Sequence, residues 1–449
     1  MTRNTVEETV AVDPGRTRRL QNRIALCAGG GEVCDGWVLG VIGPALPLAR
    51  TDLGLSSLWT GLIGAASLVG LFFGGLVFGW VTDKVGRQKM YLLDLLVFLA
   101  GSVLQFFVTD AAQLFGVRLV MGIAVGADYA IAGALVAEFA PRRRRGRMLA
   151  GLIVFWYVGY TLAATSGLAL STWMTDDSAW RWIMASSVLP SAVVLLARIG
   201  TPESPQWLAG KGRMAEADAI ARRYLGADYG KDPLRRTRTT TRYATLFVGE
   251  HSRKTLFVSL FWLCQVTPFF AISTFLPQVL DTLGVSDPSL GEISLNAFLL
   301  LGCVGGALLI DRVGRRRLLI HSFLVTTPAL LVLGLWSGAS SGVILTCFVV
   351  FALFQAAASV LQAVYPSEVF PTEIRATGLG FGAAMSRIGA AAGTFLLPMG
   401  LDSWGVGAVM LICCACSLVG ALVSIAWAPE TTGLELSEAA RPLSVTGAS

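Results

Sequence analysis

The feature that most restricts the fold of this chain is a series of apolar stretches, each about 20 residues long, which is the length of a helix that crosses a bilayer. Twelve such stretches can be placed in the 449 residues. Backbone polar groups in lipid must be satisfied within their own segment, so each stretch is expected to be an α-helix. The expected spans are 24–49, 59–82, 90–108, 113–140, 148–171, 180–199, 254–279, 290–311, 318–337, 341–365, 378–400 and 405–428.

The composition agrees with this interpretation. Only 14% of the residues are charged, whereas a soluble globular protein has about 25%. The net charge is +6, but the Lys and Arg residues lie between the apolar stretches and form no continuous basic face, so a nucleic-acid partner is not expected. The expected fold class is an all-α membrane protein with 12 transmembrane helices, and its main partner is the lipid bilayer.

The connections between the spans predict the orientation. Alternate connections contain only Arg50 and Arg181, and most of the Lys and Arg residues lie in the other connections, at 83–89, 142–147, 198–254 and 312–317. By the positive-inside rule the basic connections are cytosolic, and an even number of spans puts both termini there. The first twenty residues lack the apolar core and cleavage site of a signal peptide, so the N-terminus is expected to be retained.

Five parts are expected along the chain. They are a cytosolic N-terminal tail (1–23), a six-helix bundle (24–199), a cytosolic linker (200–253), a second six-helix bundle (254–428) and a cytosolic C-terminal tail (429–449). Within the linker, residues 214–226 alternate apolar and charged positions at helical spacing, which predicts a short amphipathic helix.

Three short motifs occur twice at nearly the same separation. DKVGRQK at 83–89 returns as DRVGRRR at 311–317, and the Pro-Glu pair at 202–203 returns at 429–430. The third repeat pairs Glu138 and Arg145 with Glu368 and Arg375. These repeats indicate that a six-helix unit was duplicated, which predicts two pseudo-symmetric bundles.

The first of these motifs, Gly79-x3-Asp83-x2-Gly86-Arg87-x-Lys89, resembles the loop between helices 2 and 3 of the major facilitator superfamily. The PESPQWL segment at 202–208 and the PETTG segment at 429–433 look like those of the sugar-porter group and its organic-ion and metabolite relatives. The resemblance covers nearly the whole chain. It implies a secondary transporter in which two bundles alternately open a central site to the two sides of the membrane.

A cytosolic gate is predicted at the repeated loops. Gly86 allows a tight turn, and Asp83 can pair with Arg87 or with the arginines that follow Glu138. A network of such pairs could favour a closed gate by a few kcal/mol, although a loop that only sets topology is the alternative. The residues assigned to the gate are Asp83, Gly86, Arg87, Glu138, Arg145, Asp311, Gly314, Arg315, Glu368 and Arg375.

Three charged residues are predicted to lie near the middle of the membrane, where a charge is expensive. Asp35, Asp128 and Arg387 each lie about 14–20 Å from the cytosolic end of their helix, which makes a shared aqueous cavity plausible. Low solvation disfavours a carboxylate, so Asp128, sharing the role with Asp35, could load and release a proton that Arg387 senses. The alternative is a fixed salt bridge of Asp128 with Arg387 or Arg118.

Arg118 and two glycines of the fourth span allow simpler interpretations. Arg118 lies near the outer end of that span, where its long side chain could reach water. In proteins that resemble sugar porters this arginine pairs with a first-helix aspartate, but Val38 occupies that position here, so the role of Arg118 stays open. Gly122 and Gly126 are four residues apart and predict close helix packing.

Polar and aromatic residues of the fifth, seventh and tenth spans are candidates for the substrate-binding wall. Core packing is the alternative for the aromatic residues among them. The candidates are Gln265, Thr267, Trp262, Gln355, Gln362, Trp156 and Tyr157.

The substrate class follows from departures from the sugar-porter pattern. The paired glutamines and the asparagine of helix 7 are absent, while GADY at 126–129 and RATG at 375–378 look more like organic-acid, nicotinate and other metabolite:proton symporters. A small organic acid or polar metabolite is therefore favoured over a sugar. A sugar:proton symporter and a proton-coupled efflux antiporter remain alternatives.

Other classes of protein fit poorly. There is no phosphate-binding loop, zinc motif or nucleophile elbow, so an enzyme, a cofactor and a metal are not expected. The eight cysteines lie in apolar segments and have no paired spacing, so they are interpreted as packing residues. A substrate sensor that does not transport is a further alternative, but it would carry a long signalling tail. A monomer in the plasma membrane of a bacterium is expected.

Overall fold

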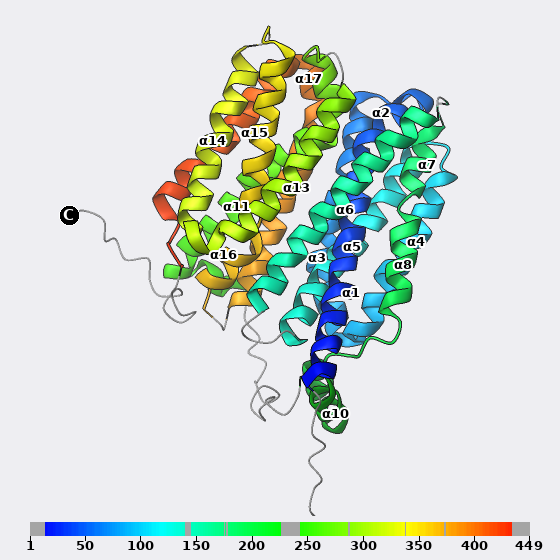
Figure 1. Cartoon of the computed structure of the whole chain (residues 1–449), viewed down its shortest axis with the longest axis vertical. Helices are drawn as coiled ribbons and strands as arrows, with labels where there is room; N and C mark the ends of the chain where they lie inside the picture. Colours follow the sequence, from blue (N-terminus) through cyan, green and yellow to red (C-terminus); the bar gives the residue numbers. More distant parts are fainter. Residues whose placement is uncertain are drawn as a thin grey trace, which may run out of the picture.

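The computed structural model describes residues 14–139, 145–174, 176, 178–225, 243–285, 288–336, 338–371 and 374–432, and the regular elements of those residues are all helices. Figure 1 shows them as two groups that stand side by side. In chain order they are α1 (Pro14–Gly40), α2 (Ile42–Asp52), α3 (Ser57–Val85), α4 (Arg87–Phe106), α5 (Ala111–Phe139), α6 (Arg145–Trp173), α7 (Ala179–Ala185), α8 (Val188–Arg198), α9 (Pro205–Gly210), α10 (Met214–Leu225), η2 (Tyr243–Phe247), α11 (Glu250–Thr274), α12 (Leu276–Thr282), α13 (Pro288–Val313), α14 (Arg315–Leu335), α15 (Ser341–Ser359), α16 (Leu361–Val369) and α17 (Arg375–Trp427).

The twelve predicted crossings correspond to eleven stretches of described helix that are long and apolar enough to span a membrane. The last stretch, Thr377–Trp427, has 51 residues, or about 77 Å of helix at 1.5 Å per residue, more than twice the hydrocarbon thickness. Gly405 interrupts it with φ 78° and ψ 165°. This stretch therefore supplies two crossings, and the predicted all-α fold class is confirmed.

The helix boundaries differ from the predicted spans at several places. Helix α1 begins at Pro14, before the predicted start of the first span at residue 24. The additional turns carry basic residues and contact α10, so they belong to a helix that continues beyond the apolar segment. Four crossings are built from two successive helices, namely α1 with α2, α7 with α8, α11 with α12 and α15 with α16. The repeated apolar pattern alone does not locate such breaks.

Each group of helices packs mainly within itself. In the N-terminal half α1 packs against α6 and α3 against α5, and in the C-terminal half α11 packs against α17 and α13 against α15. The two halves meet along α3 with α17 and along α6 with α13.

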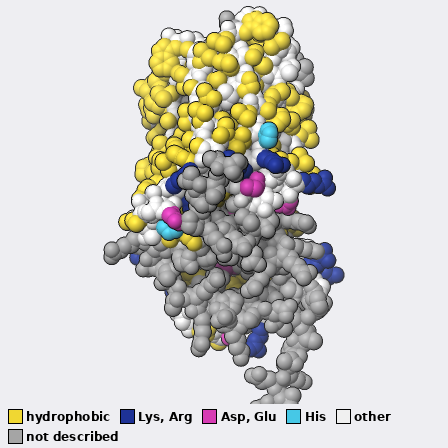
Figure 2. Space-filling view, turned by 90° about the vertical axis from the view of Figure 1, so that its left-hand side faces the viewer, with side chains coloured by type: hydrophobic (Ala, Val, Ile, Leu, Met, Phe, Trp, Pro, Cys, Tyr) yellow, Lys and Arg dark blue, Asp and Glu magenta, His cyan; other side chains and the backbone are white. Residues whose placement is uncertain are grey.

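Figure 2 shows hydrophobic side chains over a broad band of one face and Lys and Arg side chains gathered below that band. Helix α10 lies at one end of the molecule, at the bottom of Figure 1. We call this the α10 end and the other the opposite end. The amphipathic segment predicted at 214–226 is helix α10 itself, Met214–Leu225.

Glycines allow the helices of the N-terminal half to touch through their backbones. A Cβ atom added at Gly122 would lie 2.1 Å from the carbonyl oxygen of Ser67, and one at Gly126 would lie 2.5 Å from that of Leu71. The packing role predicted for these two glycines is confirmed. Between α1 and α6, a Cβ atom at Gly159 would lie 2.1 Å from the Val33 carbonyl oxygen.

Gly159→Ala is therefore expected to separate α1 from α6 and to lower the free energy of unfolding by about 1–3 kcal/mol, the usual cost of overpacking. Gly151→Ala is the matched control, because it lies on the same helix and an added Cβ atom meets nothing within 4 Å. Thermal unfolding of the purified variants measures the difference. Equal melting temperatures for the two variants would contradict the close contact.

Candidate functional site

Four of the predicted substrate-binding residues join one hydrogen-bonded group, which we call the polar wall. The Gln265 side-chain nitrogen donates to the Gln355 carbonyl oxygen at 3.2 Å, and that of Gln362 donates to Gln265 Oε1 at 3.1 Å. Gln355 Nε2 donates in turn to the backbone carbonyl of Gln265. The Tyr157 hydroxyl, from the other half, lies 2.8 Å from Ser359 Oγ. The polar wall therefore links α6 of the N-terminal half to α11, α15 and α16.

Aromatic rings continue the wall along α6 and α11. Trp156 stacks on Tyr160 with centroids 5.2 Å apart, and its ring lies 6.2 Å from those of Phe269 and Phe270. The indole nitrogens of Trp156 and Trp262 are buried, and neither has a hydrogen-bond partner among the described residues.

Thr267 is not brought into the polar wall. Its hydroxyl donates to the Leu263 carbonyl at 2.7 Å, and a Cβ atom added at Gly389 would lie 2.3 Å from Thr267 Oγ1. Residues two apart on an α-helix point about 200° apart, so Thr267 cannot share the face of Gln265. It lies instead in the packing contact between α11 and α17.

The carboxyl group of Asp35 is completely buried on α1 in the N-terminal half. Neither of its oxygens has a hydrogen-bond partner among the described residues. One turn earlier, Glu32 is also buried, and one of its oxygens likewise has no such partner. Burying a carboxylate without hydrogen bonds costs free energy, so Asp35 marks a candidate functional position in this helix.

Asp128 lies in an ion-pair triad that the sequence analysis did not predict. The Arg198 Nη2 atom lies 3.0 Å from Asp128 Oδ1, and the Nη1 atom lies 3.2 Å from Asp94 Oδ2. The guanidinium also covers the Tyr91 ring at 3.4 Å and donates to the Tyr91 carbonyl at 2.8 Å. Arg387 and Arg118, the partners considered from the sequence, do not make this pair.

Helix α1 passes directly over this triad at Gly31. A Cβ atom there would lie 1.8 Å from Arg198 Nη2 and 2.3 Å from Asp128 Oδ2. The sequence signal for the triad was Asp94 in the apolar stretch 90–108, because an acid there requires a cation. Arg198 ends an apolar stretch and was therefore counted with the basic connection 198–254.

Arg387 lies on α17 between the two halves and is 8% exposed. Its guanidinium carbon lies 5.5 Å from the Tyr129 ring centroid and 5.9 Å from that of Phe270, one ring from each half. It interacts electrostatically with Glu32 and Asp35. The structure thus brings Arg387 toward the α1 carboxyls, while Asp128 is held by Arg198.

Arg118 does not reach water, contrary to the expectation from the sequence. Its side chain is completely buried, and its Nη2 atom donates to the Val38 carbonyl at 3.4 Å while its Nη1 atom lies 3.5 Å from Gln105 Oε1. Helix α5 packs against α1, α3 and α4, and these neighbours enclose the side chain. The residue that faces it from α1 is Val38, as the sequence alignment placed it.

The gate residues of the N-terminal half are held by a segment that follows α8. Arg87 forms an ion pair with Glu138, and Glu138 also accepts a hydrogen bond from the Ser204 hydroxyl. Glu203 Oε1 accepts from the backbone nitrogens of Arg87 at 3.0 Å and Gln88 at 3.2 Å. A carboxylate at a helix N-terminus is stabilised there. The Pro-Glu motif at 202–203 therefore caps α4, a role that the sequence analysis did not assign.

The C-terminal half repeats this arrangement. Arg315 Nη2 lies 3.2 Å from Glu368 Oε1, and Glu430 Oε1 accepts from the Arg315 backbone nitrogen at 3.0 Å. Burial raises the pKa of Glu430, but hydrogen bonds from Thr432 and from the backbone of Arg315 outweigh it and leave that pKa below its ordinary value. Glu430 is therefore ionised at neutral pH.

Both turns require glycine. Gly86 has φ 113° and Gly314 has φ 90°, a region that residues with a Cβ atom rarely adopt. A Cβ atom at either position would lie 2.7 Å from Oε2 of the capping glutamate. Each turn thus brings the backbone of the loop against its cap.

The remaining gate residues are placed less completely. Asp311 lies 3.0 Å from Arg315 and is largely exposed, and Arg375 Nε donates to the Phe370 carbonyl at 3.2 Å. The side chains of Asp83 and Arg145 lie outside the described residues, as do residues 1–13, 226–242 and 433–449 of the predicted tails and linker. The predicted gating role of these residues stays a prediction.

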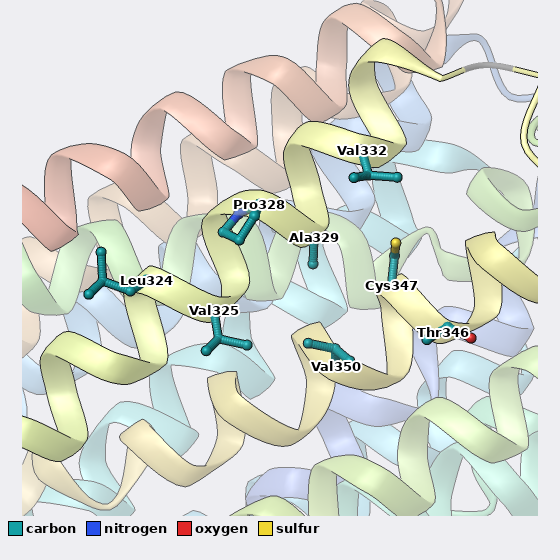
Figure 3. Close-up of a pocket in the computed structure, with 8 residues that line it drawn as sticks. All are labelled: Leu324, Val325, Pro328, Ala329, Val332, Thr346, Cys347 and Val350. Atoms are coloured by element: carbon teal, nitrogen blue, oxygen red, sulfur yellow. The ribbon is translucent and has the colours of Figure 1, made fainter.

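An apolar groove of about 370 Å³ lies between α14 and α15, away from the polar wall. Figure 3 shows the side chains that line it along both helices, beside the Pro328 turn of α14. Its lining residues are Leu324, Val325, Pro328, Ala329, Val332, Thr346, Cys347 and Val350. It offers almost no polar group to a solute.

Comparison with known proteins identifies the family. The model of the sugar (and other) transporter family matches residues 22–443. The inner membrane metabolite transport protein YgcS of Escherichia coli is 41% identical over 427 residues, which are 95% of each chain. The protein named "Putative metabolite transport protein YaaU" of the same organism is 39% identical over 423 residues, which are 93% of this chain and 94% of that one. The xylose transporter XylE from E. coli, in a partially occluded inward open conformation, has the same fold with a TM-score of 0.76 at 20% identity, over 91% of this chain and 100% of that one. The chain therefore belongs to the sugar (and other) transporter family, and it is a multi-pass membrane transporter and not an enzyme.

Proposed function

We propose that this secondary transporter carries a small organic acid or similar polar metabolite across a bacterial cytoplasmic membrane together with protons. The α10 end faces the cytosol in this proposal, because the basic connections gather there. The similarity to YgcS, an inner membrane metabolite transport protein of a bacterium, supports a metabolite as the substrate. The two halves would open the site alternately to the two sides.

The observation that carries the proposal is the arrangement of charges at the centre of the fold. Asp94 and Asp128 share the cation Arg198, whereas Asp35 has no hydrogen-bond partner among the described residues. A group that must be neutral when buried and can ionise when water enters is suited to carry a proton through the transport cycle. The sequence pattern favours Asp128 for this role, whereas the absence of a hydrogen-bond partner among the described residues favours Asp35.

Arg387 supports an anionic substrate. It cannot lose its proton, and its bidentate donors suit a carboxylate. The neighbouring rings of Tyr129 and Phe270 provide an apolar surface for the rest of the molecule. The amides of Gln265 and Gln362 and the indole nitrogens of Trp156 and Trp262 provide further hydrogen-bonding groups.

Thermal shift and uptake measurements test this function with a matched pair of probes, nicotinate and nicotinamide, which differ in charge but hardly in shape. A carboxylate substrate at about 100 times its dissociation constant should stabilise the purified protein by about 2.7 kcal/mol. Nicotinamide should stabilise it much less. Proteoliposome uptake of the acid should rise with an inward proton gradient.

Arg387→Gln should abolish the preference for the acid over the amide, while Arg387→Lys should keep part of it. Other carboxylates of similar size follow in the same screen if nicotinate itself is not bound. Stabilisation by neutral sugars and by no carboxylate would contradict the organic-acid assignment and favour a sugar:proton symporter. Uptake that is driven by an outward proton gradient would favour efflux by antiport.

A further inference from the structure

Glu292 is a buried carboxyl group that lies apart from both the polar wall and the Arg198 triad. It is on α13, four residues after Pro288, which is about 6 Å of helix from the opposite end of the molecule. The side chain is 5% exposed. The transport site proposed above does not include Glu292.

The surroundings of Glu292 come from both halves. A Cβ atom on Gly43 of α2 would lie 4.0 Å from Glu292 Oε1, and Tyr160 of α6 interacts with it electrostatically. One turn further along α13, the Asn296 carbonyl accepts a hydrogen bond from the Thr161 hydroxyl of α6 at 3.2 Å, which joins the two halves. Glu292 therefore lies in the contact that closes the opposite end.

Among the described residues, no Lys or Arg forms an ion pair with Glu292. On its own helix the Asn296 amide donates to the Glu292 backbone carbonyl at 2.9 Å. Around the adjoining glycines, the carbonyl oxygens of Ser273 and Thr274 on α11 approach Gly43, and Leu280 of α12 and Leu345 of α15 approach Gly291. Tyr160 is the titratable group among these described neighbours, and none of them is Lys or Arg.

We propose that Glu292 is a second proton-binding site, and that its protonation is required for the two halves to close at the opposite end. A buried carboxylate without a counter-ion costs several kcal/mol, so the closed state holds the proton. When this end opens, water solvates the carboxylate and the proton leaves. The closed state binds one more proton than the open state, so rising pH favours opening.

This site is distinct from the proton carrier proposed at Asp35. At the centre, Asp35 interacts electrostatically with Glu32, with Asp128 and Asp94, and with Arg198. Glu292 lies near the opposite end and has no charged neighbour among the described residues. Release of the proton from Glu292 requires only that the two halves separate at that end, whatever the substrate is. Failure of this release and failure of the proposed function can therefore be told apart.

Distance measurements between two spin labels test the inference in the absence of substrate. Ser56→Cys and Ser403→Cys place the labels on exposed residues of the two halves at the opposite end, beside the Ser57 to Asp402 hydrogen bond. In the otherwise unchanged chain, raising the pH from about 5 to about 8 should increase the population with the longer distance. The chain without these two substitutions, labelled in the same way, is the control for spin labels attached to the eight native cysteines.

Glu292→Gln should hold the short distance at every pH, because a neutral amide stays buried without a charge cost. Glu292→Asp keeps a titratable group and should retain the pH response. Asp35→Asn should retain it as well. Asp402→Asn is the control for the other carboxyl that joins the halves at this end, through Ser57 and through Arg50 at 4.0 Å. A pH response that survives Glu292→Gln, or that disappears only with Asp402→Asn, would overturn the proposal.

Discussion

Asp35→Asn is expected to abolish accumulation of the substrate against its gradient while exchange of internal for external substrate continues. The amide cannot ionise, so movement of the substrate is no longer tied to movement of a proton. A difference of one pH unit across the membrane is worth about 1.4 kcal/mol. A symporter that moves one proton per substrate molecule can therefore concentrate the substrate up to about tenfold across that difference. The variant should bring this ratio to one in proteoliposomes.

Glu32→Gln is the matched control, because it removes a buried carboxyl one turn away on the same helix. It should leave gradient-driven accumulation in place. Asp128→Asn separates the two candidate carriers, since Arg198 remains paired with Asp94 in that variant. If Asp35→Asn still accumulates substrate and Asp128→Asn does not, the proton is carried by Asp128, as the sequence alone suggested.

Arg198→Met should cause the largest loss of stability in the N-terminal half. It leaves Asp94 and Asp128 buried next to each other without a cation, and breaking a buried pair in this way costs about 3–5 kcal/mol. The fraction of protein that stays monodisperse after heating, measured by size-exclusion chromatography, reports the loss. Arg23→Met is the control, because Arg23 is an exposed arginine that donates to the carbonyl of Ile199 at 3.1 Å.

A neutral triad separates charge from packing. Adding Asp94→Asn and Asp128→Asn to Arg198→Met removes the uncompensated charges, and most of the stability should return. A triple variant as unstable as Arg198→Met would mean that the shape of the arginine matters more than its charge. A melting temperature of Arg198→Met equal to that of Arg23→Met would contradict the buried triad.

Several parts of the site could be predicted from the sequence because they depend on local pattern. Gln265, Gln355 and Gln362 are polar residues in apolar helices, and such residues turn toward one another or toward a cavity rather than toward lipid. The structure brings these three together in the polar wall. Thr267 was grouped with them by its sequence position, and the helical rotation places it on another face.

The partners of the charged residues could not be predicted in the same way. Arg198 ends an apolar stretch, and nothing in its neighbourhood distinguishes it from a loop cation. It becomes the centre of a triad because α8, α4 and α5 pack against α1 at a position where Gly31 leaves room. Glu203 and Glu430 likewise look like loop residues until the chain folds back onto the first turns of α4 and α14.

The sequence by itself determined the twelve crossings, the duplication of a six-helix unit and the clustering of cations in alternate connections. Apolar length, repetition and charge are properties of single segments, and lipid imposes the helix on each of them. The tertiary structure alone decided which carboxyls are paired and which are not. That outcome depends on contacts between helices far apart in the chain, so Asp128 received a cation, whereas Asp35 and Glu292 are buried acids that form no ion pair among the described residues.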